Sequence, residues 1–255
     1  MVRAIGVLET LAERGSGEGL SVTEIAESCD LSKSAAFAVL HTLRAHGFVA
    51  DDGTGQTRRY RLGMALSRLG ERARDQLSLP DLARPILREL TADSGLSSRL
   101  AVLQNDSAVS IDRIDAPSQI RIDLRMGARE LMHCTGVGKA MLAHLPDDEV
   151  RRIVAATGMP RRTSHTITDV DALLAHVKEV RRVGYAIDDE EDAEGIMCVG
   201  SAVRDEKGAC VGAISVTGLK AGGTADRVQE LGQATRTAAE RLSQRLGFDS
   251  AHSGR

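Results

Sequence analysis

The chain has 255 residues, which is enough for one large domain or for two smaller domains that each bury a core. Its net charge of -3 excludes a protein whose whole surface coats nucleic acid, although a local basic face is still allowed. Aromatic residues make up only 2%, which disfavours stacking platforms for single-stranded nucleic acid. Because no apolar run approaches ~18 residues and the first residues are charged, we expect a cytoplasmic protein without membrane segments.

The first 47 residues predict three short helices joined by tight turns. The first helix ends at the glycine-rich segment 15–19. Ser21, followed three residues later by Glu24, forms a capping box that opens the second helix. Ser32 is in position to cap the third helix, which Gly47 ends. The pattern therefore predicts a helix-turn-helix at about 21–46.

A two-stranded hairpin, or wing, is predicted after the third helix. Residues 48–52 begin with an apolar, β-favouring stretch, 53–57 have turn chemistry, and 58–62 alternate charged and apolar residues. We expect a winged helix-turn-helix domain over 1–63 with its wing at about 48–62, and a linker helix over 64–78.

Beyond residue 78 the pattern predicts a second domain in which helices pack on a mostly antiparallel sheet, so the expected fold class is α+β. The tail 249–255 has the composition of a disordered segment. The expected helices are 80–93, 136–145, 147–157, 169–183 and 224–246, and the expected strands are 97–104, 108–114, 119–126, 185–188, 196–203 and 209–217.

Charge supports DNA binding by the first domain. Residues 32–74 hold eight Lys or Arg against three Asp or Glu, a local excess of five positive charges. The second helix of such a motif enters the major groove. Phe37 and Val39 are expected in the core, and a protein-interaction or dimerisation module is the alternative. The expected DNA-binding residues are Ser32, Lys33, Ser34, Ala38, His41, Arg44, Arg58 and Arg59.

The stretch TGVGKA at 135–140 resembles a phosphate-binding loop but lacks two of its fixed residues, because His133 and Ala140 stand where the loop needs glycine and a hydroxyl. Thr135 is instead a good N-cap. Two glycines in the first helical turn leave N–H groups accessible, so a small carboxylate could dock there. The alternative is that the glycines let the helix pack tightly on the sheet. Lys139 is expected to be a surface or ion-paired residue.

Metal and catalytic motifs are not recognisable. The acidic run 188–195 lacks the glycine and glutamate of a calcium loop at Ala193 and Val199. The four cysteines form no CxxC pair, and no hydrolase motif is present. We therefore expect no enzyme activity, no cofactor and no metal, with a hydrolase as the strongest enzymatic alternative.

Along nearly its whole length the chain resembles the IclR family of bacterial transcriptional regulators. The stretches that carry the resemblance are AIGVLETLAE, SVTEIAESCDLSKSAA, LRAHGFV, YRLGMALSRLG, TGVGKAMLAHLP, the segment from TITDVDALL to GSAVRD, and AISVTG. The resemblance implies a C-terminal effector-binding domain of the GAF/profilin-like type over 79–248, which also serves oligomerisation. Carried over by motif, the effector pocket comprises Gly136, Val137, Asp188, Ile196, Cys198, Ser215 and Thr217, with Ile122 and Leu124 on its apolar side.

The resemblance also implies the function. The protein is expected to be a homodimer, or a dimer of dimers, that binds double-stranded operator DNA and is controlled by a small-molecule effector. We expect this effector to be a small organic acid. Ala38 stands where the family usually has arginine, and Phe37 where it usually has a polar residue, so base readout is expected to differ. Leu131 and Ala202 stand where prolines are common. A small-molecule sensor that acts through a protein partner is the alternative.

Overall fold

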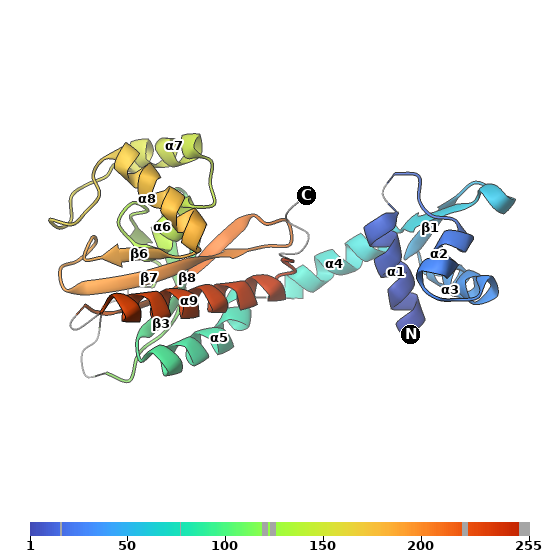
Figure 1. Ribbon diagram of the computed structural model, residues 1–255, viewed down its shortest axis with the longest axis horizontal. Coiled ribbons are helices and arrows are strands. Elements are labelled where there is room, and N and C mark those ends of the chain that lie inside the picture. Colours follow the sequence, from blue (N-terminus) through green and yellow to red (C-terminus); the bar gives the residue numbers. More distant parts are fainter. Residues whose placement is uncertain (16, 77, 119–121, 123–125, 221–223, 250–255) are drawn as a thin grey trace. The chain divides into compact units, whose positions relative to one another are not determined.

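The computed structural model describes residues 1–15, 17–76, 78–118, 122, 126–220 and 224–249. The chain divides into two compact units, Met1–Leu77 and Ser78–Arg255, which are described separately (Figure 1). None of the described helices is long and apolar enough to cross a membrane.

The N-terminal unit is a helical motif followed by a hairpin. Ser21 Oγ accepts a hydrogen bond from Glu24 N at 3.3 Å, and Ser21 N donates to Glu24 Oε2 at 2.8 Å, which confirms the capping box. Ser32 Oγ accepts from Ala35 N and caps the third helix as expected. The elements are α1 (Val2–Arg14), α2 (Val22–Ser28), α3 (Lys33–Ala45), β1 (Val49–Asp52), a 3-10 turn (Gly55–Thr57), β2 (Arg59–Leu62) and α4 (Met64–Gln76).

The core of this unit joins α1, α2, α3 and the hairpin through Val7, Ile25, Leu40 and Tyr60. Val39 packs partly against this core, but the prediction that Phe37 is a core residue is wrong: its side chain is 50% exposed. Burial on α3 instead follows Ala36, Leu40 and Leu43, which face α1 and α2. Apolar character alone does not reveal which side of a short helix meets its neighbours.

In the described residues, the C-terminal unit is built on a six-stranded antiparallel sheet in the order β5-β4-β3-β8-β7-β6. The strands β3 (Ser97–Gln104), β4 (Ser107–Ile114), β6 (Ala186–Asp189), β7 (Ile196–Arg204) and β8 (Cys210–Leu219) confirm five of the expected strands. Strand β5 (Arg129–Glu130) is an addition, while most of the expected strand 119–126 and most of the tail 249–255 lie outside the described residues.

Helices cover both faces of this sheet (Figure 1). On one face α5 (Leu79–Ser94) and α9 (Ala225–Arg245) bury a core that includes Leu87, Val199 and Leu242. On the other face α6 (Gly136–Leu142), α7 (Asp147–Thr157) and α8 (Val170–Val183) bury a second core around Met141 and Leu173. The α+β fold class is therefore confirmed.

The start of α6 lies directly against β7 because glycines face each other there. A Cβ added at Gly200 would lie 2.4 Å from Gly136 O and 2.8 Å from Val137 N, and one added at Gly136 would lie 2.9 Å from Cys198 Sγ. These distances are too short for any side chain. The tight-packing interpretation of TGVGKA therefore has direct geometric support.

We predict that Gly200→Ala lowers the free energy of unfolding of the C-terminal unit by ~1–3 kcal/mol, because the new methyl group meets backbone atoms that cannot move independently. Thermal or urea unfolding measures the change. Gly6→Ala in α1 is the control, since its Cβ meets no atom within 4 Å. Equal stability of wild type and Gly200→Ala would show that α6 is not held at this distance.

Candidate functional site

The exposed surface of α3 carries the polar residues expected to contact DNA. Ser32, Lys33 and Ser34 are exposed at its N-terminus, where Ser32 Oγ and Ser34 Oγ lie 3.1 Å apart. Ala38, His41 and Arg44 are exposed further along the same helix. Unpaired N–H groups at a helix start and adjacent hydroxyls suit phosphate oxygens.

Three arginines on or near the wing form ion pairs with carboxylates. Asp51 Oδ2 lies 3.2 Å from Arg58 Nε and 3.3 Å from Arg44 Nη1, and Arg59 Nη1 donates to Glu24 Oε2 at 2.6 Å. All three arginine side chains remain partly exposed. Ion pairs of this kind contribute little to stability, so a phosphate can replace the carboxylate at small cost.

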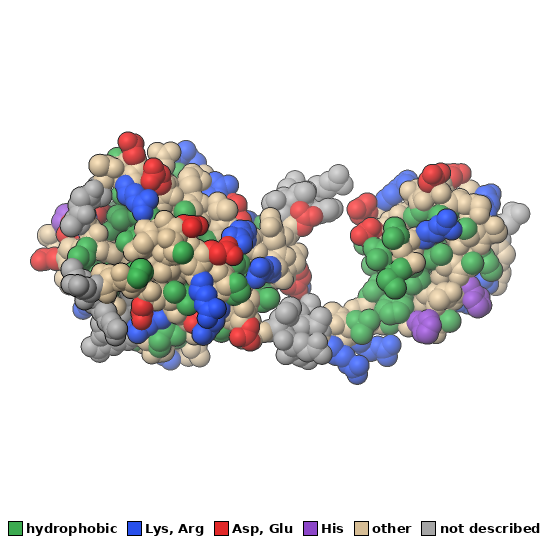
Figure 2. Space-filling model, turned by 90° about the horizontal axis from the view of Figure 1, so that it is seen from below, with side chains coloured by type: hydrophobic (Ala, Val, Ile, Leu, Met, Phe, Trp, Pro, Cys, Tyr) green, Lys and Arg blue, Asp and Glu red, His purple; other side chains and the backbone are tan. Residues whose placement is uncertain are grey.

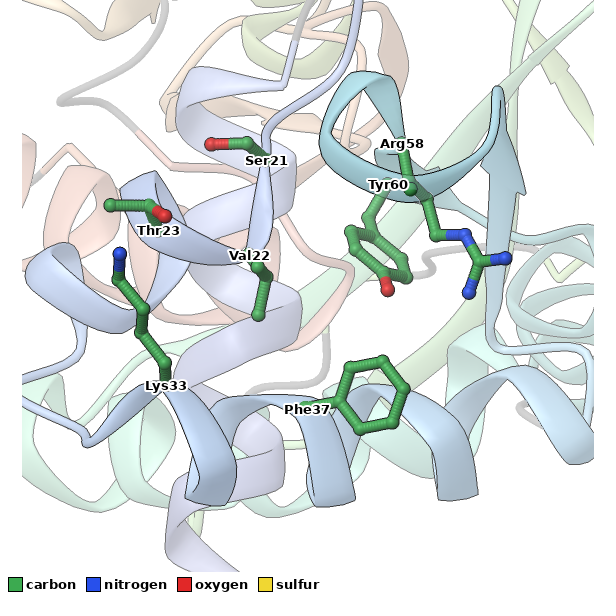
Figure 3. A pocket seen from close by; sticks show the side chains of 8 residues that line it. Ser21, Val22, Thr23, Lys33, Phe37, Arg58 and Tyr60 are labelled. Atoms are coloured by element: carbon green, nitrogen blue, oxygen red, sulfur yellow. The ribbon is translucent and has the colours of Figure 1, made fainter.

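A hollow of about 660 Å³ opens between α2, α3 and the wing (Figure 3). The side chains of Lys33 and Phe37 enter it from α3, and Arg58 lines it from the position between the 3-10 turn and β2. Its lining residues are Ser21, Val22, Thr23, Lys33, Phe37, Gly55, Arg58 and Tyr60.

In the C-terminal unit, strand pairing gathers several of the expected effector-binding residues on one sheet face. Asp188 pairs with Cys198, and Cys198 pairs with Thr217, so the three side chains lie side by side across β6, β7 and β8. Ser215 lies two residues before Thr217 and faces the same way. Gly136 joins the group because it packs on Cys198.

Arg99 on β3 also belongs to this cluster, and sequence reasoning missed it. Its side chain is buried; Nε donates to Ser215 Oγ at 3.1 Å, Nη1 donates to Glu130 Oε1 at 2.5 Å, and Nη2 lies 3.8 Å from Cys198 Sγ. Thr217 Oγ1 donates to the same sulfur at 3.3 Å. The sequence signal was a lone arginine inside a strand that is otherwise free of charge, because such a residue needs a buried partner.

Asp188 organises the loop that follows β6. Its Oδ1 accepts the N–H groups of Glu191 and Asp192, at 2.8 and 3.3 Å. Burial nevertheless raises the pKa of Asp188 to about 7, with partial compensation from these hydrogen bonds and from Lys139. The carboxyl group therefore changes charge near neutral pH.

Lys139 is not a surface residue. Its side chain is fully buried, where Nζ pairs with Glu191 and donates to Ile187 O at 2.5 Å. Burial raises the pKa of Glu191 and the ammonium group opposes that rise. The lysine thus ties α6 to β6 and the acidic loop.

Ile196 lies two residues before Cys198 on β7 and faces the same side of the sheet, whereas Val137 packs elsewhere. The side chain of Val137 packs in the core with α7 and α8, and Ile196 is partly buried at the start of β7. Ile122 is partly buried, and Leu124 lies outside the described residues. Within the described part of the chain, no three His, Cys, Asp or Glu side chains are grouped so that they could hold a metal ion.

Comparison with known proteins matches both units. The IclR helix-turn-helix domain matches residues 1–53, and the bacterial transcriptional regulator IclR C-terminal domain matches residues 72–244. The structure is similar to that of the Agobacterium tumefaciens repressor BlcR, with a TM-score of 0.84 and 26% identity over 98% of this chain and 97% of that one.

Two curated relatives from Escherichia coli (strain K12) align along almost the entire chain. The HTH-type transcriptional regulator KdgR is 32% identical over 97% of this chain and 92% of its own length. The HTH-type transcriptional repressor AllR is 32% identical over 96% of this chain and 89% of its own length. With both domains matched in order, the chain belongs to the IclR family of DNA-binding transcriptional regulators.

Proposed function

We propose that the protein is a homodimer, or a dimer of dimers, that binds a pseudo-palindromic operator and changes its operator affinity when a small organic acid occupies the C-terminal unit. The observation that carries this proposal is the buried Arg99 guanidinium. It lies among Ser215, Thr217 and Cys198, on the face where the family's effector residues gather. A buried arginine with hydroxyl neighbours is well suited to bind a carboxylate.

The acid would exchange with Glu130 on Arg99. Glu130 Oε1 also accepts from Ser110 Oγ at 3.0 Å, and the Glu130 side chain is more exposed than that of Arg99. An incoming carboxylate can therefore take its place while the buried guanidinium keeps an anionic partner, which avoids the cost of an unpaired buried charge. This exchange would link effector occupancy to the position of β5, where Glu130 lies.

Exposed apolar side chains of the N-terminal unit favour self-association. They occur on α1, at the end of β2 and on α4, and Figure 2 shows hydrophobic side chains gathered on a face of this unit. Apolar patches of this kind commonly mark protein interfaces. The residues are Met1, Val2, Ile5, Leu62, Met64 and Leu69.

Coupling between the two units would run through α4, since this helix follows the wing in the chain and precedes the C-terminal unit. Its geometry would set the spacing of the two recognition helices in a dimer. Coupling free energies are typically ~1–3 kcal/mol, which corresponds to a ~5 to 150-fold change in operator affinity.

Gel-shift titration of the purified protein tests this function, with DNA from upstream of its own gene and a panel of small keto- and hydroxy-carboxylates. We expect a sequence-specific shift whose midpoint changes with at least one acid. A protein that binds an acid but shifts no DNA would instead support the alternative, a sensor that acts through a protein partner.

We predict that Arg58→Ala reduces the slope of log Kd against log salt concentration by roughly one for each phosphate that the arginine no longer neutralises. Fluorescence anisotropy at several salt concentrations measures the slope. Arg151→Ala is the control, because Arg151 is an exposed, ion-paired arginine of the C-terminal unit. An unchanged slope would remove Arg58 from the DNA interface.

For the effector site, the double variant Arg99→Met with Glu130→Gln is expected to weaken carboxylate binding by roughly 10 to 100-fold, because the variant cannot form the charge-assisted hydrogen bond. Replacing both partners avoids leaving a buried charge unpaired. Calorimetry with the acid selected above measures the affinity, and Arg129→Met on exposed β5 is the control. Binding at wild-type affinity in the double variant would exclude Arg99 as the anchor.

Effector binding should also depend on pH. Below pH 7 Asp188 is largely protonated, and above pH 7 it is charged and repels a bound carboxylate, so affinity should fall by about fivefold or more between pH 6 and pH 8. Asp188→Asn should remove this dependence. Calorimetry across this pH range measures it, and a wild-type affinity that is constant with pH would place the acid away from Asp188.

A further inference from the structure

The strongest unexplained feature of the DNA-facing surface is Phe37. This aromatic ring is 50% exposed on α3, one helical turn after Lys33 and one turn before His41. Single exposed apolar residues are common and need no explanation. Phe37, however, adjoins the exposed Ala38 on the helix that enters the major groove.

We propose that Phe37, supported by Ala38, reads thymine through its 5-methyl group in the major groove; this inference rests on the proposed operator binding by α3. The methyl group of thymine is the apolar feature of the major-groove edge, whereas the other bases present nitrogen and oxygen atoms. Neither Phe37 nor Ala38 can donate or accept a side-chain hydrogen bond. Contact with thymine is therefore the form of direct readout open to them.

Charge around the ring supports DNA as its occupant. The segment between Asp30 and Asp51 contains no acidic residue, and Asp51 itself forms the exchangeable surface ion pair with Arg58 described above. Lys33 and Arg58 enter the hollow on either side of Phe37 (Figure 3). Cationic groups that flank an apolar ring match a base edge flanked by phosphates.

The polar rim of the hollow completes this match. Ser21 and Thr23 line it at the start of α2 and add polar side chains to its rim. The lining thus combines the cationic and polar side chains with the apolar side chain of Val22 and the rings of Phe37 and Tyr60.

Thymine-to-deoxyuridine substitution tests the proposal, because it removes only the methyl group. A duplex selected from random sequence by the full-length protein is resynthesised with each thymine in turn replaced by deoxyuridine, symmetrically in both half-sites. Anisotropy then gives Kd for wild type, Phe37→Ala and Phe37→Gln. Thr42→Ala is the control, since Thr42 is exposed on α3 but does not line the hollow.

At one thymine position of each half-site, the wild type and Thr42→Ala are expected to bind the deoxyuridine duplex about fourfold more weakly for each methyl group removed. Phe37→Ala and Phe37→Gln should bind the thymine duplex and the deoxyuridine duplex equally. A double-mutant cycle detects this coupling between the Phe37 ring and the thymine methyl group. Circular dichroism checks that both variants fold, as expected for a half-exposed position.

Two results would overturn the proposal: a wild type that distinguishes no thymine from deoxyuridine, or Phe37 variants that keep the wild-type discrimination. If Phe37→Ala binds all duplexes more weakly by the same factor, the outcome is a case of the second result. It would indicate that the ring inserts between base pairs or helps to position the protein on the phosphates. Failure of the proposed function is separate, since the wild type would then select no duplex at all.

Discussion

The close approach of two backbone segments, α6 and β7, constrains much of the C-terminal unit. Gly136 and Gly200 face each other at a distance that admits no side chain. This contact places the first turn of α6 directly on Cys198, in the middle of the polar row across β6, β7 and β8. Gly136, one of the two glycines that suggested an accessible anion site, is thus required for packing. At the other, Gly138, the N–H group already donates to the capping Thr135 Oγ1 at 3.1 Å.

Two ion pairs that each contain a buried cation lie near this contact and differ in the burial of their carboxylates. Lys139 and Glu191 are both buried and hold α6 to the acidic loop, so replacing one partner would leave an uncompensated charge. Arg99 is also buried, but its partner Glu130 is partly exposed on a two-residue strand. The first pair has the character of a structural connection, whereas the second is the pair that we propose exchanges its carboxylate for one from solution.

The N-terminal unit balances charge differently. Its wing arginines are paired with Asp51 and Glu24 at the surface, where such pairs are weak and easily exchanged. In the proposed function specificity is assigned to α3, whose exposed face combines a cationic start with the apolar Phe37 and Ala38. This combination differs from the arginine that the family usually places on this helix, and it favours contact with methyl groups over hydrogen bonds to base edges.

The sequence alone determined the order of the elements, because their signals are local: the Ser21 and Glu24 capping box, the Ser32 N-cap and the alternating strands each act within a few residues. It did not determine the exposure of Phe37, since burial depends on which side of α3 meets the neighbouring helices. Nor did it reveal the Arg99 cluster, whose arginine and Ser215 are 116 positions apart. Only the tertiary structure brings these groups together, because the pairing of β3 with β8 sets their register and burial then requires each polar group to find a partner.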